Sequence, residues 1–165
     1  MSNPDNPQNS TETSIDDVEN ATLQQYETHF IHAMELRQQG NTQAASKILL
    51  AILKEEPRLP EPHLEIAHIY YSIDQLDDAQ THIEQAVQQL ENGGQWLDIP
   101  ENDLLSIAYV LQGEIYRGLA DQDEIVLGNP ERFQDLINRA KNAFNKAKMI
   151  DPANAEVVGH SRDWA

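Results

Sequence analysis

The chain has 165 residues, no cysteine, and 28 acidic against 11 basic side chains, which gives a net charge of −17. This length suits one domain with a core of its own. The missing cysteines exclude disulfides, thiolate metal sites and cysteine nucleophiles. The acidic balance argues against nucleic acid and anionic membranes as partners, because both attract clusters of Lys and Arg. It favours solubility and would steer basic partners toward the surface.

The two ends of the chain differ in composition from its middle. Residues 1–13 are mostly Asn, Pro, Ser, Thr and acid, which bury too little apolar surface to offset their ordering entropy, so we expect a disordered acidic leader. This leader has neither the basic nor the apolar stretch of a signal peptide. The longest aliphatic run, Ile48 to Leu53, is too short to span a bilayer. We therefore expect a cytoplasmic protein, with residues 160–165 as a C-terminal tail.

Between these ends, apolar residues recur at helical spacing and are interrupted by turn residues. Gly40 suits a left-handed turn at the end of a helix, and Gly93-Gly94 breaks another. The expected helices run from Ser14 to Gly40, from Asn41 or Thr42 to before Pro57, from about Pro60 to before Asp74, and from about Leu76 to Leu90. Two short helices around a tight turn, followed by two more, indicate a repeated helical hairpin.

A 34-residue period relates the two hairpins. Ala33, Leu36, Ala45, Leu49 and Ile52 recur as Ala67, Tyr70, Ala79, Ile83 and Ala86, with Gly40 matched by Asp74. The small residues occupy positions where two helices approach closely. Self-similarity at this period resembles the tetratricopeptide repeat family, and the chain is similar to a small three-repeat member. His29 and His32 depart from the pattern, since they stand where first helices usually carry large apolar residues.

A third unit fits the same pattern in two separated pieces. Gly113 and Tyr116 take the places of Ala67 and Tyr70, and Ala140, Phe144, Ala147 and Pro152 keep the spacing of the second helix. Asn129-Pro130-Glu131 predicts the start of a last helix that runs to Ile150. The expected domain covers residues 14–159, with repeat one at about 22–57, repeat two at about 60–91, an insert at about 91–102, and repeat three at about 103–152 with an internal insert at about 121–135.

The resemblance implies an all-α fold of antiparallel helical hairpins, stacked as a short right-handed solenoid. It also implies that the first helix of each hairpin lines a concave groove for a partner peptide. The implied groove positions are Phe30, Met34 and Arg37 in repeat one, Leu64, His68 and Tyr71 in repeat two, and Val110, Glu114 and Arg117 in repeat three.

This stripe mixes apolar anchors with charged residues, as expected of a peptide groove. On this interpretation the two arginines would pair with acidic or carbonyl groups of the peptide. Three other interpretations stay open. The chain's own tail, or the region of Trp96 or Trp164, covers the stripe. Self-association occurs through the N-terminal helix or an open end of the solenoid. Some members of the stripe are core residues.

No motif predicts catalysis or a cofactor. The chain has no GxSxG, no glycine-rich phosphate loop and no HExxH. His29 and His32 lie three residues apart, with Glu35 or Thr28 nearby, but this spacing alone is a weak signal for a metal. The acidic stretch from Asp121 lacks the glycine and the terminal glutamate of a calcium loop.

We therefore expect a non-catalytic protein–protein interaction module, acting as an adaptor, assembly factor or scaffold, with no cofactor and no bound metal. The main alternative is a dedicated secretion-type or assembly chaperone that acts as a homodimer. An enzyme or a metal-binding protein is the alternative from another class, and no cluster of residues supports it.

Overall fold

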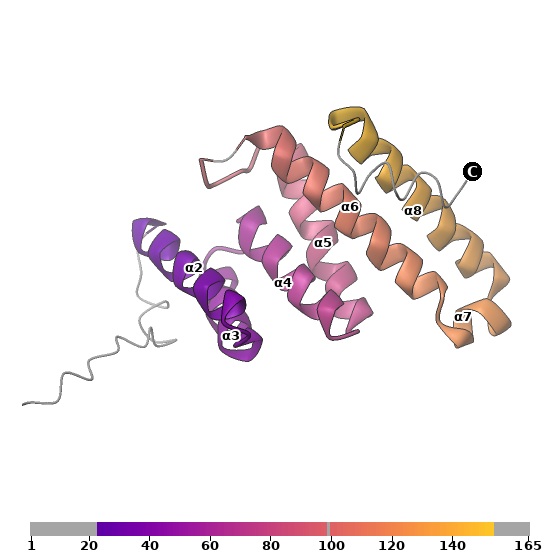
Figure 1. Ribbon diagram of the computed structural model, residues 1–165, viewed down its shortest axis with the longest axis horizontal. Helices are drawn as coiled ribbons and strands as arrows, with labels where there is room; N and C mark the ends of the chain where they lie inside the picture. Colours follow the sequence, from indigo (N-terminus) through magenta and orange to yellow (C-terminus); the bar gives the residue numbers. More distant parts are fainter. Residues whose placement is uncertain (1–22, 99, 154–165) are drawn as a thin grey trace, which may run out of the picture.

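The computed structural model describes residues 23–98 and 100–153 (Figure 1). Within these ranges the chain is all-α, as predicted, and contains no strand. The helices are α2 (Leu23–Gln38), α3 (Thr42–Glu55), α4 (Pro60–Ser72), α5 (Leu76–Glu91), α6 (Glu101–Ala120), α7 (Asp123–Gly128) and α8 (Pro130–Ile150). The expected leader, the helix start at Ser14 and the C-terminal tail with Trp164 lie outside the described residues.

The tight turns of the first two hairpins have the same geometry 34 residues apart. Gly40 and Asp74 both adopt positive φ, at 83° and 60°. After α2 the Asn41 N–H donates to the Leu36 carbonyl at 2.9 Å, and after α4 the Gln75 N–H donates to the Tyr70 carbonyl at 2.9 Å. These bonds satisfy carbonyls that the end of a helix leaves open. The predicted equivalence of Gly40 and Asp74 is therefore confirmed.

The helices pack as successive antiparallel pairs. The pair α2 and α3 lies at one end of the stack, α4 and α5 lie in the middle, and α6 and α8 lie at the other end (Figure 1). Alanines occupy the closest approaches within the first two pairs, and all four are fully buried: Ala33, Ala45, Ala67 and Ala79. A larger side chain there would separate the helices.

Two apolar clusters form the core and meet at α4. One lies among α2, α3 and α4, and the other extends from α4 to α8. Tyr70 packs against both clusters, so the stack is continuous through its middle hairpin. Trp96 and Leu97 belong to the segment between α5 and α6, which follows the second hairpin in sequence. Both nevertheless pack against the cluster among α2, α3 and α4.

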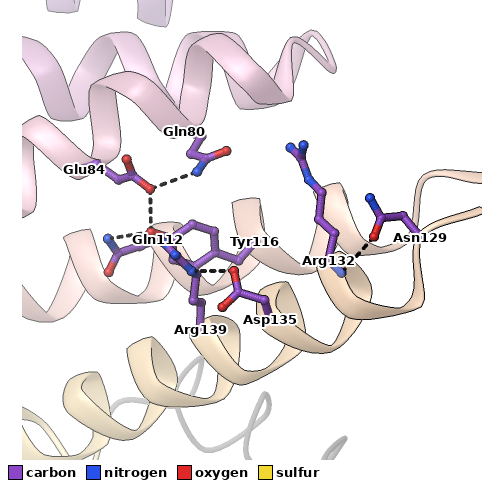
Figure 2. Close-up of polar contacts among 8 residues, drawn as sticks. All are labelled: Gln80, Glu84, Gln112, Tyr116, Asn129, Arg132, Asp135 and Arg139. Atoms are coloured by element: carbon purple, nitrogen blue, oxygen red, sulfur yellow. Dashed lines mark hydrogen bonds and ion pairs between the residues drawn. The ribbon is translucent and has the colours of Figure 1, made fainter. Parts of the chain in front are cut away.

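The third hairpin lacks the tight turn of the other two. Asp121, which follows α6, has a helical φ of −77°, and the short helix α7 fills much of the insert expected at about 121–135. The predicted start of the last helix is confirmed. Pro130 is its first residue, and the Asn129 side chain accepts a hydrogen bond from the Arg132 N–H at 3.1 Å (Figure 2).

Gly113 gives the third pair its close approach, and this position generates a stability prediction. A Cβ at Gly113 would lie 2.5 Å from Cε1 of Phe144, a ring that is buried in the core. We expect Gly113→Ala to lower the free energy of unfolding by about 1–3 kcal/mol, because overpacking outweighs the better helix propensity of alanine. Urea titration followed by circular dichroism measures this change.

Gly118→Ala is the matched control in the same helix. Its Cβ would meet the side chain of Leu76, with the nearest methyl carbon at 3.1 Å, and that side chain can shift slightly. We expect a change within about 1 kcal/mol in either direction. Equal stability of Gly113→Ala and wild type would contradict the packing assigned to Phe144.

Candidate functional site

The first helices of the three hairpins, α2, α4 and α6, carry all nine residues expected in the groove; we call their shared surface the first-helix face. The structure divides these residues by depth. Phe30, Leu64 and Val110 are buried, with 7%, 3% and 5% of their surface exposed. They pack beneath the face as core residues, so Leu64→Ala would disturb the fold together with any binding. The other six are partly exposed: Met34, Arg37, His68, Tyr71, Glu114 and Arg117.

Arg37 and Glu65 join α2 to α4 across this face. Their ion pair spans 3.3 Å between Arg37 Nη2 and Glu65 Oε2. Burial raises the pKa of Glu65, and Arg37 opposes this rise. Burial also lowers the pKa of the neighbouring His68, and the charge of Arg37 lowers it further. Among the described residues, Arg37 Nε is a buried donor with no hydrogen-bond partner, whereas Glu65 Oε2 is held by the ion pair, so the guanidinium keeps one unused N–H.

Tyr71, Glu114 and Arg117 come together between α4 and α6. With Gly118 and Asp121 they line a cavity of about 200 Å³. Burial raises the pKa of Tyr71, Glu114 raises it further, and Arg117 opposes the rise. The tyrosine hydroxyl therefore stays protonated at neutral pH and can donate a hydrogen bond. The cavity combines an aromatic ring with charges of both signs, which suits a mixed peptide side chain or backbone.

The segment between α5 and α6 lies across the first-helix face, and we call residues 95–98 the strap. The backbone N–H groups of Trp96 and Leu97 both donate to Oε1 of Glu61, each at 2.8 Å. The Trp96 ring meets the Phe30 ring edge-on, with centroids 5.9 Å apart. The strap therefore connects to α4 through a carboxylate and to α2 through an aromatic pair, and it covers the position expected for an apolar anchor in repeat one.

Glu61 is a site residue that the sequence interpretation missed. It is 3% exposed, and its Oε2 has no hydrogen-bond partner among the described residues. It stands between Pro60 and Pro62, which have no N–H groups to offer its carboxylate at the start of α4. An acidic residue enclosed by two prolines, together with a tryptophan in an otherwise polar insert, is the sequence signal that points to this contact.

The opposite side of the stack holds a polar network between α5, α6 and α8. Glu84 accepts hydrogen bonds from the Tyr116 hydroxyl at 2.7 Å and from Gln80 at 2.9 Å, while Arg139 pairs with Asp135 at 2.9 Å and lies over the Tyr116 ring (Figure 2). Burial raises the pKa of Tyr116 to about 12, and the bond to Glu84 adds to the rise. This phenol is a protonated donor and not an activated nucleophile.

The same arrangement repeats two helical turns away. Glu91 accepts from the Tyr109 hydroxyl, and Lys146 pairs with Glu91 at 3.5 Å while lying 5.3 Å from the Tyr109 ring centroid. Burial and Glu91 raise the pKa of Tyr109 well above its ordinary value. A cavity of about 310 Å³ lies between α5 and α8 and includes both glutamates. Since its charged groups bond to one another, we interpret the network as a connection between the second and third hairpins.

The histidines considered for a metal do not converge. His32 lies 3.8 Å from Glu35, and the residues that the structure describes contain no group of three or more His, Cys, Asp or Glu side chains placed to hold a metal ion. The histidine pair in contact is instead His63 and His82, with their Nδ1 atoms 2.9 Å apart. His63 Nε2 donates to the Pro57 carbonyl at 2.8 Å, so its Nδ1 accepts and His82 Nδ1 donates.

Comparison with protein-family models gives a match to part of the chain. Residues 36–98 match a family model described as tetratricopeptide repeat. The matched segment includes α3, α4 and α5 and ends in the strap. A search of curated proteins and a search of solved structures each found no match. In the described ranges, no helix is long and apolar enough to cross a membrane.

The histidine pair generates a pH prediction. Burial and, to a smaller extent, His63 lower the pKa of His82 to about 4, against the opposing charge of Asp78. Burial also lowers the pKa of His63. Between about pH 6.5 and pH 4 the unfolded chain therefore binds more protons at these sites than the folded chain does. Stability from the neutral pair is present above pH 6.5 and is lost as the pH falls toward 4.

We expect the melting temperature to fall between pH 7.5 and pH 5 by roughly 2–4 °C more in wild type than in His82→Gln, as measured by thermal unfolding. Both proteins share the titration of the many carboxylates, so their difference isolates the histidine. An identical fall in the two proteins would show that the pair does not titrate as described.

Proposed function

We propose that the protein, whose residues 36–98 match a tetratricopeptide-repeat family model, is a non-catalytic interaction module that binds a partner peptide on its first-helix face. Such a module acts as an adaptor, assembly factor or scaffold. Helical repeats of this family bind protein partners, and side chains on successive first helices give the peptide a continuous surface. The proposed contact residues are the six partly exposed members: Met34, Arg37, His68, Tyr71, Glu114 and Arg117.

The observation that carries this proposal is the unused N–H of Arg37 in its pair with Glu65. A buried polar atom without a hydrogen bond costs about 1–3 kcal/mol, and native proteins rarely leave one unsatisfied. Arg37 Nε is such an atom, on a guanidinium that Glu65 holds in place from the adjacent helix. A peptide offers the missing partner, since its carbonyl groups accept hydrogen bonds from arginine.

Charge and shape give the face a preference. The net charge of −17 attracts basic segments and raises their association rate, an effect that salt screens. The cavity at Tyr71 offers an aromatic surface beside Arg117 and Glu114. We therefore propose a partner segment that combines basic residues with apolar ones.

A dimeric chaperone is the second candidate, favoured by apolar residues exposed at the end of the stack. Leu23 and Ile31 are 56% and 51% exposed, and their separation of eight residues on α2 places them about 80° apart around the helix. Leu50 on α3 is 39% exposed. Exposed apolar residues at the open end of a helical stack suit contact with a second copy, and mass measurement over a range of concentrations tests for it.

Substitution of two partly exposed residues, Tyr71 and Arg117, tests the proposed face. We expect Tyr71→Ala and Arg117→Ala each to weaken partner binding by about 1–3 kcal/mol, because each removes a central contact while Leu64 and Val110 beneath them are unchanged. Affinity capture from native lysate with wild type and the double variant, read by mass spectrometry, identifies the partner. Titration calorimetry with that partner then measures each single variant.

Met149→Ala is the matched control, since Met149 is 83% exposed on α8, away from the first-helix face. Circular dichroism melting of all variants separates loss of binding from loss of fold. A partner captured equally by wild type and the double variant, with both folded, would show that binding uses another surface.

A further inference from the structure

The strap is longer than its role as a connection requires. Four residues, 56–59, connect α3 to α4, whereas nine residues, 92–100, connect α5 to α6. The additional length carries Trp96 past α4 to the Phe30 ring on α2, a helix of the first hairpin. In Figure 1 the connection between α5 and α6 extends beyond α4 toward α2. The chain thus places one of its own segments on the surface where the proposed function places a partner.

The strap binds Glu61 in the manner of a short peptide. Two consecutive backbone N–H groups, from Trp96 and Leu97, converge on one carboxylate oxygen, an arrangement in which a turn of backbone encloses an anion. The Gln95 side chain closes this turn by donating to the Leu97 carbonyl at 2.7 Å. Besides the ring of Trp96 against Phe30 and the side chain of Leu97, the strap contacts α4 through its main-chain N–H groups. A segment from another protein can supply the same groups.

Glu61 offers more than the strap uses. Its Oε1 accepts both N–H groups, while its Oε2 is buried with no hydrogen-bond partner among the described residues. Trp96 and Leu97 are themselves only partly buried. A competing segment that also donates to Oε2 would therefore gain a charge-assisted hydrogen bond that the strap lacks.

We propose that the strap is a built-in competitor for the surface of α2 and α4 that it covers at Phe30 and Glu61. The partner segment is a linear peptide in which an aromatic residue is followed by an aliphatic one, and it binds by displacing the strap from Phe30 and Glu61. This inference rests on the proposed function and specifies its ligand. Both residues of the peptide need a free backbone N–H, so neither is proline. Because the strap is tethered beside this surface, the peptide binds the intact protein more weakly than it binds a protein whose strap is released.

A peptide with the strap's own sequence, GGQWLDI, tests the proposal when it carries a fluorescent label. The proteins are the wild type and a strap-released variant, Trp96→Pro with Leu97→Pro, which lacks both side chains and both backbone N–H donors. We expect the labelled peptide to bind the released variant at least about tenfold more tightly than wild type, as measured by fluorescence anisotropy. Equal affinity for the two proteins, or no binding to the released variant, would overturn the proposal.

Two controls address the contacts themselves. A peptide with N-methyl groups on the tryptophan and leucine amides keeps both side chains but cannot donate to Glu61, and we expect at least a tenfold loss of affinity for the released variant. Glu61→Ala in the released background should cause a similar loss with the unmodified peptide. Retention of affinity in both controls would overturn the role of the carboxylate, and circular dichroism verifies that each variant is folded.

Two further measurements separate this inference from its alternatives. If the wild type is a dimer and the released variant a monomer by mass, the strap acts between two copies, which overturns competition within one chain. The proposed function is tested separately at Tyr71 and Arg117. A partner lost by those variants, together with failure of the strap peptide, would retain the interaction face and reject only the competitor role.

Discussion

The architecture depends on how closely the two helices of each hairpin approach. In the first two hairpins that approach is made possible by fully buried alanines, two per hairpin, and in the third by Gly113 against the ring of Phe144. Small residues at a fixed spacing bring the helix axes together, so the apolar face of each helix is covered by its partner and by the next hairpin. The remaining surface of α2, α4 and α6 is then presented at regular intervals along the stack, and this regularity is what a linear partner can use.

Local chemistry explains why much of the fold could be predicted from the sequence. Gly40 and the Asn129-Pro130 pair each determine a helix end within a few residues of their own positions. The 34-residue period relates the first hairpin to the second, and the observed helix bounds follow these signals closely. The structure differs from the sequence prediction in the third hairpin. The expected insert after α6 is largely helical, because α7 begins at Asp123 and α8 begins only two residues after α7 ends. A short helix such as α7 depends on packing against its neighbours, which periodicity over six residues cannot reveal.

The candidate site could be predicted only in outline. A repeat register tells on which side of a helix a residue lies but not how deep it lies, so it groups Leu64 and Val110 with Tyr71 although both are buried in the core. Glu61 could not be singled out among 28 acidic residues. Its importance arises from the N–H groups of Trp96 and Leu97, about one full repeat away in sequence, and such a contact depends on the path of the connecting segment.

The two sides of the stack use their charged residues differently, and this difference bears on where a partner binds. Between α5 and α8, Glu84 and Glu91 each accept a hydrogen bond from a tyrosine, and Arg139 and Lys146 lie over the rings of those tyrosines. On the first-helix face, Glu61 keeps one buried oxygen and Arg37 keeps its Nε without a hydrogen-bond partner among the described residues. A network whose members satisfy one another stabilises the junction of two hairpins but gains little from a ligand. A face with an unused acceptor and an unused donor gains a charge-assisted hydrogen bond when a ligand supplies the missing partner, so a ligand gains more free energy by binding on α2 and α4.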